Sequence, residues 1–313
     1  MTPSLLSARR RVVITGLGVV APNGLGRQQF WNAAVEGRSG IDWISNFDTS
    51  DTYCKIGGEI KDLDPTDYMD AKTAKKAGRF SMYAVTAARM ALDDAGIDTG
   101  RCDPYRMGAV FGTTLAGLGN IGDEMYHQFE HKGPRGVDPV APSQLSAHAA
   151  TANVFIEFGM KGPNTTSCVG CVSSLDAVAT CADVLRSGKA DIMVAGGTEA
   201  CLSIVGMSLL CAQRVLTRQN DPPQKACRPY DDTRDGLVLS EGAGAIVVET
   251  AEHAMERGAH IYAEVLGYAS TTEAYHLLLS DPSGEELAHA FRQALLEAKV
   301  DGSEIDYICA HGI

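Results

Sequence analysis

The sequence has 313 residues, of which 45% are hydrophobic and 21% are charged, a composition typical of a globular protein that can bury a full core. Its formal net charge of −12 argues against a nucleic-acid-binding protein, because such proteins need a basic surface to displace counterions from phosphates.

The cysteines and the N-terminus indicate the compartment. The nine cysteines are an odd number, and most lie in apolar runs where they are typical of small buried side chains rather than of a disulfide framework. The N-terminal arginines follow a short apolar stretch, the reverse order of a secretory signal, and no run approaches the roughly 18 apolar residues of a membrane span. We therefore expect a cytoplasmic protein that binds neither membranes nor nucleic acid.

Strands and helices alternate along the chain. The apolar patterns predict a strand over 12–15, a helix over 30–35, a helix over 81–95, a strand over 108–112 and a helix over 144–158. The polar segment 117–142 has no clear apolar period, and we interpret it as a long excursion that covers a site or a partner.

The second half of the chain continues the alternation. The predicted elements are a helix over 172–187, strands over 191–197, 236–239 and 244–249, a strand over 263–266, a helix over 285–298 and a strand over 307–310. The short turn between the strands at 236 and 244 favours an antiparallel pair, so the sheet is expected to be mixed. The round that starts at residue 263 resembles the start of the first one.

Cys171 is a candidate nucleophile. The polar turn at 165–167 leads through Cys168 and Cys171 into a predicted helix, and the free N–H groups and aligned peptide dipoles at a helix start stabilise a thiolate. The backbone N–H of Cys171 can also serve as an oxyanion donor. Judged on these residues alone, however, a cysteine that only packs in the core is the more common case.

Cys168 and Cys171 also form a Cys-x-x-Cys pair, which occurs in redox proteins and in zinc sites. A thioredoxin-like pair would need a small βαβ domain around it, and a structural zinc site would need a second pair or two closely spaced histidines, which the sequence lacks. Both interpretations stay weaker alternatives, and no metal site is predicted.

His311 is the most suggestive histidine. It directly follows a predicted strand, where α/β sheets present reactive groups, although a hydrogen-bonded loop histidine would give the same pattern. His276 is a weaker candidate, and no role is assigned to His127, His131 and His148.

Two glycine-rich motifs are interpreted as turns. Residues 16–24, GLGVVAPNG, are out of register with a GxGxxG dinucleotide motif and are predicted to form a strand-to-loop turn. Residues 240–244, SEGAG, are predicted to form a tight turn rather than a phosphate-binding loop, because no helix follows them.

Six segments resemble, in order, the β-ketoacyl-[acyl-carrier-protein] synthase family. They are RRVVITGLGVVAPNG with FWNAAVEGRSGI, GPNTTSCVGCVSS, KADIMVAGGTEA, CRPYDDTRDGLVLSEGAGAIVVE, EAYHLL and YICAHG. The resemblance covers essentially the whole chain. It implies a thiolase-like α/β fold of five layers, αβαβα, with residues 1–255 as the N-terminal half that holds the nucleophile and residues 256–313 as the start of an incomplete C-terminal half.

The resemblance also implies the roles of two residues. The family's nucleophile follows a Gly-Pro at a fixed interval and precedes a small residue and a serine, which selects Cys171, and its first active-site histidine stands in a His-Gly, which selects His311. The implied reaction is a decarboxylative Claisen condensation. An acyl group moves from a carrier protein to Cys171, a malonyl thioester loses carbon dioxide, and the resulting enolate attacks the acyl-cysteine while His311 stabilises the enolate oxygen.

The implied partners are an acyl carrier protein and a second subunit, in a homodimer or in a heterodimer with a ketosynthase-like chain. The carrier supplies the phosphopantetheine, so the synthase itself is expected to need no cofactor. Arg214 and Arg218 lie in a segment that resembles the family's carrier-facing region. The cluster Lys72, Lys75, Lys76 and Arg79 is a second basic candidate, for which a solvated helix face is slightly favoured.

The sequence departs from the family in three respects. The family continues beyond residue 313 and supplies there a lysine, a second histidine and a glycine-rich loop, so we expect a further segment to complete the second sheet and this chain alone to be inactive in condensation. Ile313 and Leu278 each stand where the family usually has threonine.

Two alternative functions stay open. A non-catalytic companion subunit that sets chain length would resemble a synthase but typically lacks the cysteine. A thiolase-type enzyme acting on coenzyme A esters is the second alternative, and PYDDTRDG and SEGAG favour the carrier-protein branch over it.

Overall fold

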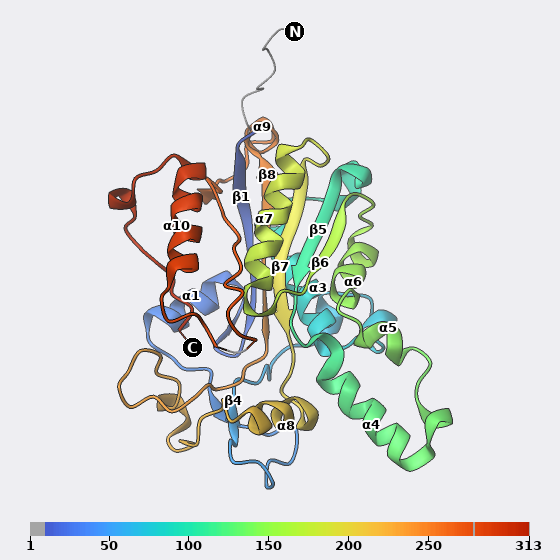
Figure 1. Cartoon of the computed structure of the whole chain (residues 1–313). Helices are drawn as coiled ribbons and strands as arrows, with labels where there is room; N and C mark the ends of the chain where they lie inside the picture. The colour runs from blue at the N-terminus through green and yellow to red at the C-terminus, as the bar shows by residue number, and fades with distance from the viewer. Residues whose placement is uncertain (1–9, 278, 313) are drawn as a thin grey trace.

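A mixed sheet runs through the centre of the molecule (Figure 1). The computed structural model describes residues 10–277 and 279–312, so Leu278 and Ile313 lie outside the described residues. The strands follow the order β2-β1-β8-β7-β5-β6, with β9 also paired to β1. Their bounds are β1 Val12–Ala21, β2 Gly24–Leu25, β5 Met107–Gly112, β6 Asn164–Ser167, β7 Ile192–Glu199, β8 Gly242–Thr250 and β9 Ala263–Glu264. β5 is parallel to β6 and β7, whereas β8 is antiparallel to β7 and β1, which confirms the mixed sheet.

Helices cover both faces of this sheet because its strands are apolar on both sides. Along β7, Val194 packs with α3 (Arg79–Asp94) and α6 (Ala149–Phe158), while its neighbours Met193 and Ala195 pack with α7 (Ser173–Arg186) on the opposite face. Successive side chains of a strand point to opposite faces, so a continuous apolar run feeds both helical layers. Figure 1 shows α7 in front of the strands and α3 behind them.

The glycines of the first strand explain how closely α3 packs. A Cβ at Gly16 would lie 2.1 Å from the carbonyl oxygen of Ala91, and one at Gly18 would lie 1.9 Å from that of Ala87. Both glycines belong to β1, which ends at Ala21, and the turn of this motif lies at Pro22 and Asn23, so the predicted strand-to-loop turn is present but starts later in the motif. The glycines are needed for the approach of strand and helix.

The remaining elements lie at the ends of the sheet or on its sides (Figure 1). They are α1 Arg27–Val35, β3 Asp42–Trp43, β4 Ile56–Gly57, α2 Ala71–Ala74, α4 Asn120–Lys132, α5 Ala141–Leu145, α8 Ile204–Gln213, α9 Ala251–Glu256 and α10 Glu285–Ala298. β4 and α8 belong to a lobe below the sheet that has its own small core, formed by Cys54, Ile56, Leu202, Met207, Leu216 and Ala226.

The polar segment 117–142 is not an irregular excursion. It contains α4, whose apolar residues Ile121, Met125 and Phe129 recur at a spacing of four, and the first two residues of α5. The Asp123 carboxylate accepts hydrogen bonds from the N–H groups of Ile204 and Val205, which begin α8. The helix is therefore fixed by a contact with a residue 81 positions away, a contact that local periodicity does not reveal.

The predicted hairpin around residues 240–244 is also wrong. Residues 236–239 form no strand, because Leu237 exchanges backbone hydrogen bonds with Val215 and Thr217 instead. Gly242 is already the first residue of β8 and pairs with Glu199 at the end of β7. Pairing with a long neighbouring strand outweighs the turn preference of the glycines.

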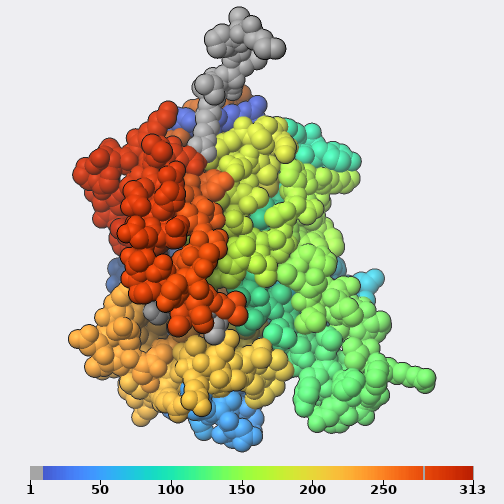
Figure 2. Space-filling view, viewed as in Figure 1, coloured from blue at the N-terminus to red at the C-terminus, as the bar shows by residue number. Residues whose placement is uncertain are grey.

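The described residues from 256 onward add to the first sheet. β9 pairs with β1 there, and the predicted strand at 307–310 does not form: Tyr307 is 81% exposed and Ile308 61% exposed, and within the described residues this segment has no strand partner. The helix–sheet–helix arrangement is three of the five expected layers, with α10 beside α7. Figure 2 shows these residues, coloured orange to red, as one block over one side of the molecule.

Candidate active site

Cys171 lies in a short turn between β6 and α7. The turn spans Gly170–Val172, α7 begins at Ser173, and Gly170 has a φ of 73°, a conformation that a glycine adopts without strain. The Cys171 side chain is exposed. The predicted position at the start of a helix is confirmed.

Ser173 closes this turn. Its hydroxyl is buried, accepts a hydrogen bond from Val169 N–H at 2.9 Å and donates to the Gly170 carbonyl at 2.6 Å. The same oxygen lies 3.4 Å from the carbonyl oxygen of Thr113, which follows β5. The turn that carries Cys171 is thus held by the second residue after it.

A cavity of about 350 Å³ opens beside Cys171. The carboxyl ends of β5 and β7 and the start of β8 line it, mostly with glycine and threonine. A Cβ at Gly112 would lie 2.3 Å from the Ser173 carbonyl carbon, so only glycine allows α7 to begin this close to the strand. Small residues therefore leave room for a substrate above the thiol.

Glu199, at the end of β7, is a residue of this cavity that the sequence did not single out. Its Oε2 accepts hydrogen bonds from Thr114 N–H at 2.8 Å and Leu115 N–H at 3.0 Å. Burial raises the pKa of Glu199, and the hydrogen bonds from Leu115, Thr114 and Thr113 offset only part of that rise. The one signal for Glu199 in the sequence is that a carboxylate ends a predicted core strand.

His311 is exposed and does not contribute to the described lining of this cavity. The next residue, Gly312, donates its N–H to the Tyr230 hydroxyl oxygen at 3.1 Å, so the end of the described chain rests on the loop around Tyr230. His276 is also exposed, and its Nδ1 accepts a hydrogen bond from Leu279 N–H.

Arg214 and Arg218 are both exposed, just after α8. Arg214 caps that helix in the left-handed conformation, with φ 59°, and the Arg218 guanidinium lies 4.6 Å from the centre of the Tyr53 ring. Arg79, which belongs to the basic cluster at residues 72–79, makes contacts within the protein. Its guanidinium donates a hydrogen bond to the Leu202 carbonyl and forms an ion pair with Glu241.

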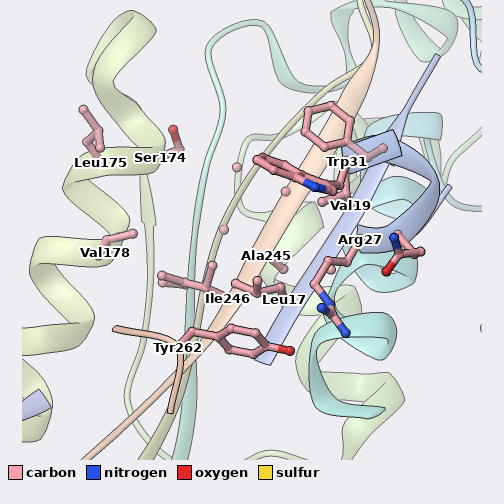
Figure 3. Close-up of a pocket in the computed structure, with 17 residues that line it drawn as sticks. Leu17, Val19, Arg27, Trp31, Ser174, Leu175, Val178, Ala245, Ile246 and Tyr262 are labelled. Atoms are coloured by element: carbon pink, nitrogen blue, oxygen red, sulfur yellow. The ribbon is translucent and has the colours of Figure 1, made fainter. Parts of the chain in front are cut away.

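A second, apolar cavity of about 580 Å³ adjoins the first (Figure 3). Leu17, Trp31, Val178 and Ile246 project toward it, and Ser174 lines both cavities. Two polar side chains that line this cavity are paired with Asp94: Arg27 forms an ion pair with it, and the Tyr262 hydroxyl donates a hydrogen bond to its carboxylate. The thiol of Cys171, which lines the adjoining cavity, is therefore the candidate reactive group of this region.

Among the described residues, no cluster of His, Cys, Asp and Glu has the make-up of a metal site. None of the described helices is long and apolar enough to cross a bilayer.

Family models match nearly the whole chain. The β-ketoacyl synthase N-terminal domain matches residues 9–254, and the β-ketoacyl synthase C-terminal domain matches residues 262–313. The chain is 36% identical to 3-oxoacyl-[acyl-carrier-protein] synthase 2 of Synechocystis sp. over 304 residues, which are 97% of this chain and 73% of that protein. It is 37% identical to the enzyme of the same name from Staphylococcus aureus strain COL over 308 residues, covering 98% and 74%.

Solved structures give the same result. The ishigamide ketosynthase/chain length factor superposes with a TM-score of 0.90 at 34% identity, covering 97% of this chain and 74% of that one. A type II PKS acyl-carrier protein in complex with its ketosynthase bound to the hexaketide superposes with a TM-score of 0.85 at 31% identity and the same coverage.

Proposed function

Since the chain belongs to the β-ketoacyl synthase family, we propose that it catalyses the decarboxylative condensation of an acyl group on Cys171 with a malonyl thioester. The observation that carries this proposal is the thiol of Cys171 at the start of α7, exposed to a cavity that small residues keep open. A nucleophile held at a helix start by a rigid turn is suited to repeated acylation and release.

The reaction has two stages. The Cys171 thiolate attacks the carbonyl carbon of an acyl thioester, the bond from that carbon to the carrier sulfur breaks, and the carrier leaves as a thiolate that takes up the proton Cys171 lost when it ionised. A malonyl thioester then loses carbon dioxide, and the carbanion that results attacks the acyl-cysteine and releases the Cys171 thiolate. The Cys171 backbone N–H is proposed as an oxyanion donor in both stages.

His311 is proposed to donate a hydrogen bond to the malonyl thioester oxygen as enolate charge develops. This role rests on the family resemblance of the His-Gly motif. It requires His311 to approach Cys171 when substrate is bound, and such an approach can be followed by solution NMR of the histidine ring.

The proposed partners are an acyl carrier protein, which brings the acyl group on its phosphopantetheine, and a second ketosynthase-like subunit. Support comes from the relatives, one of which is a ketosynthase in complex with its acyl-carrier protein and another a ketosynthase/chain length factor. Arg214 and Arg218 are proposed to bind the carrier, since both are exposed cations on an otherwise acidic chain. We also propose that the chain divides near residue 255 into an N-terminal half, which carries Cys171, and the start of a C-terminal half.

The test is intact-mass analysis after incubation with an acyl-carrier protein that bears a labelled acyl group. We expect a mass increase of one acyl group, located on the peptide that contains Cys171, and none in Cys171→Ala. An adduct mainly on Cys168 would contradict the assignment. Acylation by a coenzyme A ester but not by the carrier would favour the thiolase-type alternative, and the presence of Cys171 disfavours a non-catalytic companion subunit.

A further inference from the structure

Glu199 lines the same cavity as Cys171 and takes no part in the reaction proposed above. Two successive backbone N–H groups, those of Thr114 and Leu115, donate to one and the same oxygen, Oε2. The Thr113 hydroxyl lies 3.4 Å from both carboxylate oxygens. One side chain therefore fixes three successive residues after β5.

The segment that Glu199 fixes does not hold its shape by local preference. Ala116 has a φ of 52°, in the left-handed region that residues with a Cβ rarely adopt. The N–H of Ala116 donates to the Thr113 hydroxyl at 3.2 Å, so the strained residue is tied to the residue that contacts Glu199. Strained backbone of this kind persists only where the surroundings determine it, and here the carboxylate supplies the contacts.

The same segment contacts the turn that carries Cys171 at both of its ends. Thr113 N–H donates to the Ser167 carbonyl at 3.1 Å, ahead of the nucleophile. After the nucleophile, the Ser173 hydroxyl oxygen lies 3.4 Å from the Thr113 carbonyl oxygen. A displacement of Thr113 therefore reaches Cys171 from either side.

We propose that Glu199 is a positioning residue for Cys171, acting through residues 113–115 on the turn at 167–173. The inference rests on the proposed function in one respect: the position of the thiol matters because Cys171 accepts the acyl group. The described hydrogen bonds of the Glu199 carboxylate are with residues 113–115 and not with the thiol. The carboxylate holds residues 113–115, and Thr113 in turn contacts the turn at Ser167 and Ser173.

The test compares Glu199→Ala with Glu199→Gln in the full chain. Two rates are measured: alkylation of Cys171 by iodoacetamide, followed by peptide mass, and acylation by an N-acetylcysteamine thioester, with kcat and KM determined separately. We expect Glu199→Ala to lower both the alkylation rate and kcat by at least about tenfold, with KM nearly unchanged, because the thiol is displaced while the pocket stays open. Glu199→Gln should restore most of both rates, since its amide oxygen can accept the two N–H groups at the position of Oε2.

Glu249→Ala is the matched control. Glu249 is also a buried carboxylate that accepts several hydrogen bonds, but its partners Thr15, His253 and Arg257 do not line the cavity beside Cys171. Urea unfolding of each variant gives the folded fraction. If Glu199→Ala fails to fold, Glu199→Asp takes its place, because a carboxylate one methylene shorter cannot reach both amides.

Alkylation of Cys171 at the wild-type rate in Glu199→Ala would overturn the proposal. So would a loss no larger than that in Glu249→Ala, or one explained by the unfolded fraction. Alkylation does not depend on acyl transfer, so the two proposals can fail separately. A wild-type chain that alkylates normally but accepts no acyl group contradicts the proposed function and leaves the role of Glu199 intact.

Discussion

The Ser173 hydroxyl donates to the Gly170 carbonyl oxygen at 2.6 Å and thereby closes the turn around the two residues between them, Cys171 and Val172. Because this hydrogen bond joins atoms on either side of Cys171, the turn keeps its shape without the cysteine side chain. The Cys171 thiol is exposed and adds little buried area, so the fold does not depend on it.

The first prediction concerns this thiol. We expect iodoacetamide to modify Cys171 before the other eight cysteines, including the exposed Cys168, Cys227 and Cys309, because the start of α7 stabilises a thiolate. Peptide mapping at low reagent excess measures the order of labelling.

The controls for this prediction are Cys168→Ala and Cys171→Ala. The first should leave the labelling of Cys171 unchanged, and the second should abolish acyl transfer while it changes the free energy of unfolding by no more than about 0.5 kcal/mol. Labelling mainly at Cys168 would show that the wrong cysteine has been assigned.

The second prediction concerns the contact between β5 and α7. Gly112→Ala should lower the free energy of unfolding by about 1–3 kcal/mol and slow the alkylation of Cys171, because the new Cβ would meet the Ser173 backbone at 2.3 Å. Urea unfolding and iodoacetamide kinetics measure the two effects.

Gly244→Ala is the matched variant. Gly244 lines the same cavity, but an added Cβ there meets no atom within 4 Å. It should unfold within about 0.5 kcal/mol of the wild type. Equal effects of the two substitutions would mean that glycine flexibility, and not the close approach at Gly112, is what matters.

The third prediction concerns acid stability. Burial by itself raises the pKa of Glu249, but hydrogen bonds from Arg257, Thr15 and His253 outweigh burial and leave the pKa below its ordinary value. A carboxyl group with a lowered folded-state pKa stabilises the fold above its ordinary pKa of about 4.3 and loses that contribution as the pH falls through the folded value.

Glu249→Gln should therefore cost about 3 kcal/mol near neutral pH, because it leaves the Arg257 guanidinium partly buried without its carboxylate. The difference from the wild type should shrink below about pH 4. Urea unfolding at the two pH values measures it, and a difference that stays constant with pH would rule out the carboxylate charge as its source.

The fourth prediction concerns the carrier. Glu substitutions at Arg214 and Arg218 should slow acylation by a carrier-bound substrate, most strongly at low salt, where the Debye length exceeds about 10 Å. Acylation by a small N-acetylcysteamine thioester should stay nearly unchanged.

Glu substitutions at Arg101 and Arg135 make the same change in net charge on other exposed parts of the surface and should have a smaller effect. Equal losses with carrier-bound and small thioesters would mean that Arg214 and Arg218 support the site itself. Arg218 deserves a separate variant, since its guanidinium also lies over the Tyr53 ring.

The sequence predicts what depends on local pattern. The buried strands β5 and β7 and the helices α3, α7 and α10 follow from apolar periodicity, and the place of Cys171 follows from the strand and helix on either side of it. The errors lie where distant partners decide. β8 starts at Gly242 because β7 extends to Glu199, and α4 is fixed by the contact of Asp123 with the start of α8.

The contacts of Glu199 cannot be predicted from the sequence for the same reason. Its two backbone donors lie 85 and 84 residues earlier in the chain, and no local pattern brings them together. His311 was selected by family resemblance, and its approach to Cys171 stays a prediction.

The pairing of Glu199 with Gly242 at the end of β7 and β8 has one more consequence. Residues 200–241 leave the sheet and return to it between these two partners, and they pack into a small core of their own with Cys54 and Ile56. An insert whose two ends are fixed side by side can change in length and sequence without shifting the strand register. Divergence within this insert, which includes the proposed carrier-binding residues Arg214 and Arg218, offers evolution a way to change an exposed surface while the surroundings of Cys171 are inherited unaltered.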